Sequence, residues 1–146
     1  MQIGDSLSVP SNDILQNLNG LGGIMTIGGD LVICENPMLA NLDGFSSLME
    51  VGGDIQVKNC LVIEYIRFVS LTRVGGSCIY LNLPSLFSIG SATIGEFGGF
   101  GLTFFGGGIR YVNLPSLVWI TGFAGLSEIQ GDLLSLIHIS EPTRPY

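Results

Sequence analysis

The sequence contains little charge, and positive charge is the scarcest. Only 12% of its 146 residues are charged, and five Lys and Arg stand against twelve Asp and Glu, which gives a net charge of −7. Four of the five basic residues are spread along the chain before its C-terminal end: Lys58, Arg67, Arg73 and Arg110. Nucleic-acid binding needs a clustered basic face, so we expect no nucleic-acid partner.

Long apolar runs and a secretory leader are missing as well. No stretch of 18 uninterrupted apolar residues occurs, so we expect no membrane-spanning segment. The first residues, MQIGDSLSVPSNDI, lack the basic and apolar regions of a signal peptide. Either the protein is cytosolic or its true N-terminus lies upstream. A 47% hydrophobic content excludes a disordered chain and a coiled coil.

Residues that commonly carry catalysis or bind cofactors are few. The single histidine is His138, and Cys34, Cys60 and Cys78 follow neither a CxxC nor a zinc-site spacing. The glycine runs lack the G-K-[ST] of a phosphate-binding loop and the fingerprint of a dinucleotide site. We therefore expect no catalytic residue, no cofactor and three buried free thiols, with a Cys34–Cys60 disulfide as a marginal alternative.

The last thirteen residues, 134–146, differ from everything before them. The stretch LSLIHISEPTR (134–144) resembles the conceptual translation of a transposase-type sequencing adapter. We expect 134–146 to be a non-native tail and the natural chain to have been cut near Asp132 or Leu133. On this interpretation His138 has no function.

Glycine, by contrast, is abundant, with 22 residues, and it recurs in pairs. IGGDLVI begins at Ile27, VGGDIQV at Val51, VGGSCIY at Val74 and FGGFGLTF at Phe97, in steps of 24, 23 and 23, and IQGDL begins at Ile129. A period of 20–29 residues with recurring Leu, Ile and Asn is typical of stacked coils. We predict a mainly β fold, a right-handed leucine-rich β-solenoid of about 4–5 coils of 23–24 residues, over 21–133.

Each part of the repeat has an expected structural role. Segments such as DLVI, DIQV and CIYL alternate like short strands, and the Gly-Gly pair permits a corner where a Cβ would clash. Asparagine recurs after each strand, and we expect these residues to stack as a structural ladder that bonds neighbouring coils. The predicted ladder consists of Asn36, Asn59, Asn82 and Asn113.

Residues 1–20 are expected to cap the N-terminal end of the solenoid, because a solenoid end exposes its core. In SNDILQNLNG (11–20), Ser11, Asn12 or Asp13 can begin a short helix, and Gly20 can end it. The apolar residues of one helix face are Ile14, Leu15, Leu18 and Leu21.

The best candidate binding site is an eight-residue insertion in the fourth unit, within FGGGIRYV (105–112). Loops on a rigid scaffold often carry recognition, and Arg and Tyr are frequent at interface hot spots. Arg110 and Tyr111 are therefore predicted to bind a ligand, with a tolerated surface insertion as the alternative. Trp119 is either an exterior platform for a sugar ring or a core residue.

Asp30 and Asp54 occupy the same place in neighbouring coils and form a weak calcium candidate. Their carboxylates would lie about 5 Å apart and repel each other, and Ca²⁺ would relieve that repulsion. The alternative is that each carboxylate bonds turn amides and faces solvent. Two carboxylates are too few for a closed metal site, so no metal is predicted.

The repeats resemble those of known surface proteins. IGGDLVICENPMLANLDGFSSLMEVGGDIQV (27–57) resembles the receptor L-domain repeat, and NLPSLVWITG and NLPSLFSIG are similar to repeats of fungal GPI-anchored cell-wall and sporulation proteins. The resemblance implies an extracellular or cell-surface module that recognises a protein or glycan, as in adhesion, without enzymatic activity. A structural cell-envelope repeat and a β-helical polysaccharide-cleaving enzyme are the alternatives; the latter needs several gathered carboxylates.

Overall fold

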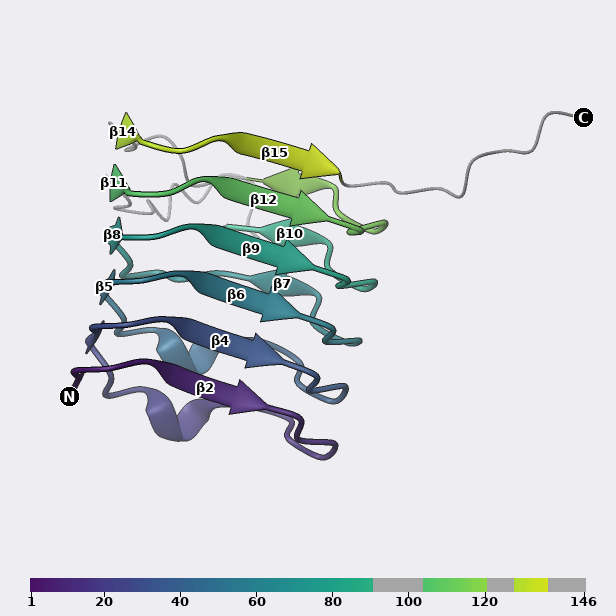
Figure 1. Ribbon diagram of the computed structural model, residues 1–146. Coiled ribbons are helices and arrows are strands. Elements are labelled where there is room, and N and C mark those ends of the chain that lie inside the picture. The colour runs from purple at the N-terminus through teal and green to yellow at the C-terminus, as the bar shows by residue number, and fades with distance from the viewer. Residues whose placement is uncertain (91–103, 121–127, 137–146) are drawn as a thin grey trace, which may run out of the picture.

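The computed structural model describes residues 1–90, 104–120 and 128–136, and they form a parallel β-solenoid (Figure 1). Every coil contributes one four-residue strand to a six-stranded front sheet, in which each strand pairs parallel with its neighbours. The front strands, in chain order, are β2 (Leu7–Pro10), β4 (Leu31–Cys34), β6 (Ile55–Lys58), β9 (Cys78–Leu81), β12 (Ile109–Val112) and β15 (Leu133–Leu136). The prediction of a mainly β solenoid is confirmed.

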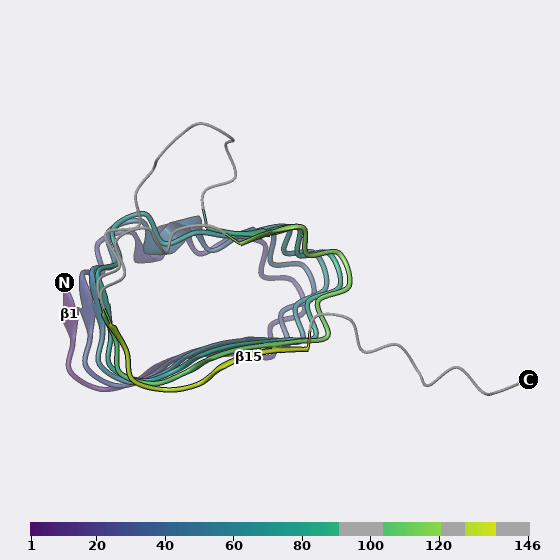
Figure 2. The same ribbon diagram turned by 90° about the horizontal axis from the view of Figure 1, so that it is seen from above.

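Two further faces complete each coil. A side sheet precedes the front strands and consists of β1 (Gln2–Ile3), β3 (Thr26–Ile27), β5 (Glu50–Val51), β8 (Arg73–Val74), β11 (Phe104–Phe105) and β14 (Glu128–Ile129). The back face begins with two 3₁₀ turns and continues as a three-stranded sheet: η1 (Asn19–Leu21), η2 (Asp43–Phe45), β7 (Tyr65–Ile66), β10 (Ser88–Ile89) and β13 (Trp119–Ile120). Seen from the C-terminal end, the chain runs counterclockwise while rising toward the viewer, which is a right-handed path (Figure 2).

The coil length follows the predicted repeat except in one coil. Bonds between equivalent corner positions of successive coils span 24, 24, 23 and 31 residues. The long step arises between Ile89 and Phe104, because Ile89 pairs with Ile120 while Phe104 pairs with Arg73. The eight extra residues therefore precede FGGGIRYV rather than lying within it. The FGG run at 97–99 lies outside the described residues.

The predicted N-terminal helix is wrong, because residues 1–20 belong to the first coil. Strand β1 pairs with β3 and β2 pairs with β4. The segment QIGDSLSVP (2–10) is therefore a degenerate copy of the repeat unit TIGGDLVIC (26–34). No α-helix occurs among the described residues, and the 3₁₀ turn η1 begins only at Asn19, at the end of this segment. Ile14 is 87% exposed whereas Leu18 is buried, since the chain turns a corner here instead of forming one apolar helix face.

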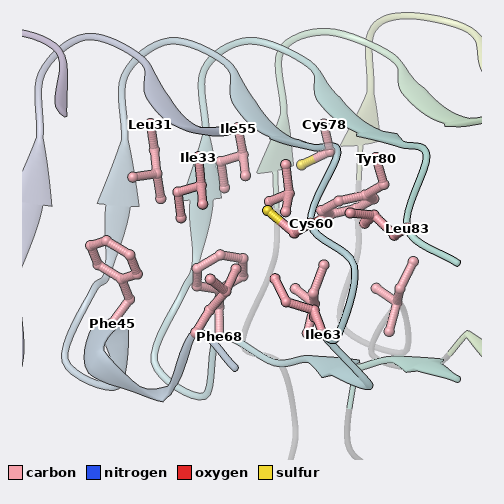
Figure 3. Packing of buried hydrophobic residues seen from close by; sticks show 14 of the residues in the cluster. Leu31, Ile33, Phe45, Ile55, Cys60, Ile63, Phe68, Cys78, Tyr80 and Leu83 are labelled. Carbon is pink, nitrogen blue, oxygen red and sulfur yellow. The ribbon is translucent and has the colours of Figure 1, made fainter. Parts of the chain in front are cut away.

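The core fills the space between the three faces (Figure 3). Front strands alternate buried and half-buried residues, so Leu31 and Ile33 of β4 point inward and the residues between them point outward. Phe45 and Phe68 meet in the core with ring centroids 6.4 Å apart. Burial of each such aliphatic or aromatic side chain contributes about 1.5–3 kcal/mol, and the stacking of coils supplies that burial.

The end of the described chain continues the same pattern. Strand β15 pairs with β12, and it includes the first three residues of the expected non-native tail. Residues 137–146, with His138, lie outside the described residues. Across the part of the chain that is described, no helix is long and apolar enough to cross a membrane.

Candidate recognition face

Three of the four predicted asparagines, Asn59, Asn82 and Asn113, form the ladder. Asn113 donates from Nδ2 to Oδ1 of Asn82 at 2.9 Å, and Asn82 donates from Nδ2 to Oδ1 of Asn59 at 3.0 Å. All three have positive φ, at 53°, 53° and 54°, a left-handed conformation that Asn tolerates better than most residues. Asparagine therefore serves here both as a backbone corner and as a link between coils.

Asn36 lies outside this ladder, so the predicted register is wrong by one residue in that coil. The corner position of the second coil is Glu35, with φ of 56°, and in the first coil it is Ser11, with φ of 43°. Asn36 is fully buried, and its Nδ2 donates to the carbonyl oxygens of Val9 and Cys34 at 2.8 and 2.9 Å. Its role is still structural, because its amide bonds backbone groups of its own turn and, as predicted, of the preceding coil.

Asp30 and Asp54 connect coils at the opposite corner of the front strands. The backbone N–H of Asp54 donates to Oδ1 of Asp30 at 2.8 Å, and the N–H of Ser77 donates to Oδ1 of Asp54 at 2.7 Å. One oxygen of each carboxylate is thus bonded to the next coil. No group of three metal-ligating His, Cys, Asp or Glu residues is gathered within the described ranges.

The glycine pair beside these carboxylates is required by close packing. A Cβ on Gly52 would collide with the carbonyl group of Gly28 in the preceding coil, and a Cβ on Gly53 would collide with the Asp30 carboxylate. This confirms the predicted role of the pair at the corner, and it explains why the aspartate and the glycines recur together.

Arg110 and Tyr111 are not in a loop, which corrects the predicted binding site. Both lie on β12, where they pair with Ile79 and Tyr80 of β9. The Tyr111 side chain is 2% exposed and stacks on Tyr80 inside the core, with ring centroids 5.8 Å apart. Burial raises the pKa of Tyr111 above its ordinary value. Arg110, by contrast, is exposed on the outer face.

Trp119 lies on β13 at the back of the solenoid, where it pairs with Ser88 of β10. Its side chain is outside what the structure describes, so the choice between a sugar platform and a core residue stays a prediction. Strand β13 belongs to the back sheet, whereas Arg110 lies on β12 of the front sheet. The two predicted residues therefore do not form one site.

The cysteines are free, and two of them are buried. Cys60 and Cys78 lie in the core, as predicted, whereas Cys34 is half-buried on the outer face of β4. Burial raises the pKa of the Cys60 thiol and raises that of Cys78 to about 12. Both buried thiols are protonated at neutral pH, and a protonated thiol is a poor nucleophile.

The outer face of the front sheet carries the group of side chains that we call the front patch. It consists of the outward residues of three adjacent strands, β6, β9 and β12. These residues are Gln56, Lys58, Ile79, Leu81, Arg110 and Val112. Three of the six are aliphatic, two are cationic and none is acidic. Sequence reasoning identified Arg110 alone; the alternation within the strands could have identified the others.

The two cations of the front patch differ from Arg67 and Arg73, which both form ion pairs. Arg67 pairs with Asp43 at 3.1 Å and Arg73 pairs with Glu50 at 3.5 Å, both away from the front sheet. Lys58 and Arg110 form no ion pair with any acid in the described part of the chain. Neighbouring strands lie about 4.8 Å apart and residues rise about 3.3 Å each, so the Cα atoms of these two residues are separated by about 12 Å.

The stacked parallel coils define the protein's class as a β-solenoid. No family model, no curated protein and no solved structure matches the chain. The fold and the front patch are therefore the observations on which a function can be proposed.

Proposed function

We propose that this protein is a noncatalytic recognition module that binds a protein or glycan through the front patch. The observation that carries the proposal is a partly aliphatic sheet face with two cations that form no ion pair within the described residues, on a chain with net charge −7. Such a face gives an arriving anionic ligand both a steering charge and an apolar contact area.

The state of the acidic and thiol groups within the described residues supports the noncatalytic part of the proposal. Asp30 and Asp54 use their carboxylates to hold the next coil, and the buried thiols of Cys60 and Cys78 are protonated. Carboxylates and thiols are among the groups that carry out general acid–base catalysis when they lie within reach of a substrate. The front patch contains neither a carboxylate nor a thiol.

We further propose that the module is leucine-rich, related to receptor L-domains, and displayed outside the cell or at its surface, where it takes part in adhesion. The support for this is the sequence resemblance at 27–57 together with the stacked coils, which offer an extended surface for a large ligand.

The proposal is tested by screening the immobilised protein against a panel of purified surface proteins and glycans. Binding should be lost in the double variant Lys58→Ala, Arg110→Ala. It should persist in the control Gln16→Ala, Val118→Ala, whose changes lie on exposed residues of the back. A ligand that binds the double variant as well as the unchanged protein would place recognition elsewhere on the solenoid.

A further inference from the structure

We infer that the front patch takes an acidic amphipathic helix, with two carboxylates about two helical turns apart and aliphatic residues between them. This inference rests on the proposed function and names the chemical class of its partner. It follows from three features of the patch: the positions of its cations, the nature of its centre and the state of its backbone.

The cations lie at opposite corners of the patch. Lys58 pairs in register with Leu81, which pairs with Val112, and Arg110 comes two residues before Val112. The chain's acids outnumber its basic residues by twelve to five, so an acidic partner is repelled by most of the molecule and attracted to this face. Charge complementarity therefore selects a partner that carries two separated negative charges.

The centre of the patch selects against a sugar. Ile79 and Leu81 form the middle row, and neither offers a hydrogen-bonding group. A sugar ring laid across them would bury hydroxyl groups without partners, at a cost of about 1–3 kcal/mol each. Aliphatic side chains of a peptide would gain about 0.8 kcal/mol for each CH₂ group that they bury there.

The backbone of the patch selects a helix rather than an extended peptide. Strand β9 is hydrogen-bonded on both sides, to β6 and β12, so its N–H and C=O groups are already satisfied. A partner that lies on this face must satisfy its own backbone, which a helix does and an isolated strand does not.

The separation of the Lys58 and Arg110 Cα atoms sets the spacing that we expect for the acids. A helix rises 1.5 Å per residue, so a separation of about 12 Å corresponds to about seven or eight residues. Positions i and i+7 of a helix lie on the same face as i+3 and i+4. The expected partner has Glu or Asp at i and i+7 and Leu, Ile or Val at i+3 and i+4.

Binding of synthetic probes to the full chain tests this inference, with titration calorimetry as the readout. The first probe is a helical peptide with Glu at i and i+7 and Leu at i+3 and i+4. The second is the same peptide with both Glu replaced by Gln, and the third is polygalacturonate. We expect the Glu peptide to bind at least tenfold more tightly than the Gln peptide, and polygalacturonate not to bind.

Protein variants complete the test. Lys58→Gln with Arg110→Gln should weaken binding of the Glu peptide at least tenfold, and Ile79→Ser should weaken it without changing the net charge. Gln16→Glu with Val118→Glu, which changes the net charge by the same amount on the back, should leave the affinity unchanged.

Two outcomes overturn the inference. Equal binding of the Glu peptide to the unchanged protein and to the Lys58→Gln, Arg110→Gln variant would do so. Absence of binding by the Glu peptide would do so as well, and binding of polygalacturonate in its place would leave the proposed function standing with a glycan ligand. Failure of the proposed function itself is distinct, since it requires that the protein and glycan panel yields no ligand dependent on Lys58 and Arg110.

Discussion

The back of the solenoid is built in two ways, whereas the front is built in one. In the first two coils the back is a 3₁₀ turn, and its inward residues are three apart, as in Leu42 and Phe45. In the third coil the back becomes strand β7, and the inward residues Ile66 and Phe68 are two apart. The front strands pair in register through both regions.

This difference explains why the repeat shortens from 24 to 23 residues. A turn places every third residue inward and a strand places every second one inward, so the change removes one residue without disturbing the front sheet. Local sequence preferences determine whether the back of each coil is a turn or a strand. Asn41 Oδ1 accepts the N–H of Asp43 at 3.0 Å and favours the turn, whereas Tyr65 and the β-branched Ile66 favour a strand.

The largest expected effect comes from adding a side chain to Gly44, which packs closely against Leu18 of the preceding coil. A Cβ on Gly44 would meet the backbone and Cβ of Leu18, whereas a Cβ on Gly20 would have nothing within 4 Å. Gly44→Ala should lower the free energy of unfolding by about 3 kcal/mol, because backbone atoms must move. Gly20→Ala should change it by less than about 0.5 kcal/mol. Equal losses in urea unfolding would contradict this packing of the two turns.

A second contrast concerns alkaline pH, because the later coils carry Cys78, Tyr80 and Tyr111 in the core where the first two coils carry aliphatic residues. An unfolded thiol ionises near pH 9, whereas burial holds the pKa of Cys78 at about 12. Below pH 9 the Cys78 thiol therefore does not lower the free energy of unfolding. Between pH 9 and pH 12 this thiol lowers it by about 1.4 kcal/mol per pH unit, because the unfolded state ionises first.

This contrast can be measured by urea unfolding between pH 8 and 11 for the unchanged protein and for Cys78→Val. Valine is suitable because the residues that pair with Cys78 on the two neighbouring strands, Ile55 and Ile109, are also aliphatic. The variant should lose less stability as the pH rises. Identical pH slopes for both proteins would show that the thiol is not buried as described.

The asparagine corner separates the same two regions, since Asn59, Asn82 and Asn113 follow Ser11 and Glu35 at equivalent positions. Asn82→Ala should cost about 2 kcal/mol, from two lost hydrogen bonds and a left-handed alanine. Asn82→Gly should cost about half of that, because glycine adopts the left-handed backbone conformation without strain.

Glu35→Asn should raise the melting temperature by a few degrees, because asparagine tolerates the left-handed corner better than glutamate does. A decrease would mean that the Ser11–Glu35 hydrogen bond of 2.8 Å contributes more to stability than the corner conformation does.

The smallest expected effect lies at the junction of the two back structures. Arg67 of the strand-bearing coil donates from Nε and Nη2 to the Asp43 carboxylate at 3.1 and 3.2 Å, and Tyr65 donates to the same carboxylate at 3.2 Å. The pair is partly exposed, so Arg67→Ala should cost about 0.5–1 kcal/mol, and less in 1 M salt. A loss that does not depend on salt would assign the effect to packing.

Much of the fold was predictable because the recurring Gly-Gly pairs mark where each coil begins its front strand. The Gly-Gly pairs located β4, β6 and β9, since the clash at Gly52 and Gly53 makes glycine obligatory there. The first coil escaped prediction because Gly4 is followed by Asp5, so no glycine pair marks it. The spacing of Ile14 and Leu18 fits a helix face equally well, and only pairing with the next coil decides between the two.

The candidate site was predictable only in part. Arg110 was identified, but FGG begins at Phe97 and again eight residues later at Phe105. The choice of the earlier copy displaced β12 into a loop and Tyr111 onto the surface. The ladder was shifted at Asn36 because Glu35 occupies the left-handed corner, which sequence preference alone would not assign to glutamate. The alternation within their strands could have placed Lys58 and Ile79 on the outer face, but only strand pairing shows that they lie beside Arg110.

A crystal structure of the chain is the most direct test of stacked coils that gather distant residues on one face. It should show the amides of Asn59, Asn82 and Asn113 joined in a file at about 3 Å. It should also show Lys58 and Arg110 on the same outer sheet face, two strands apart. A structure with Arg110 in a loop outside the front sheet, or with the three amides apart, would contradict the account.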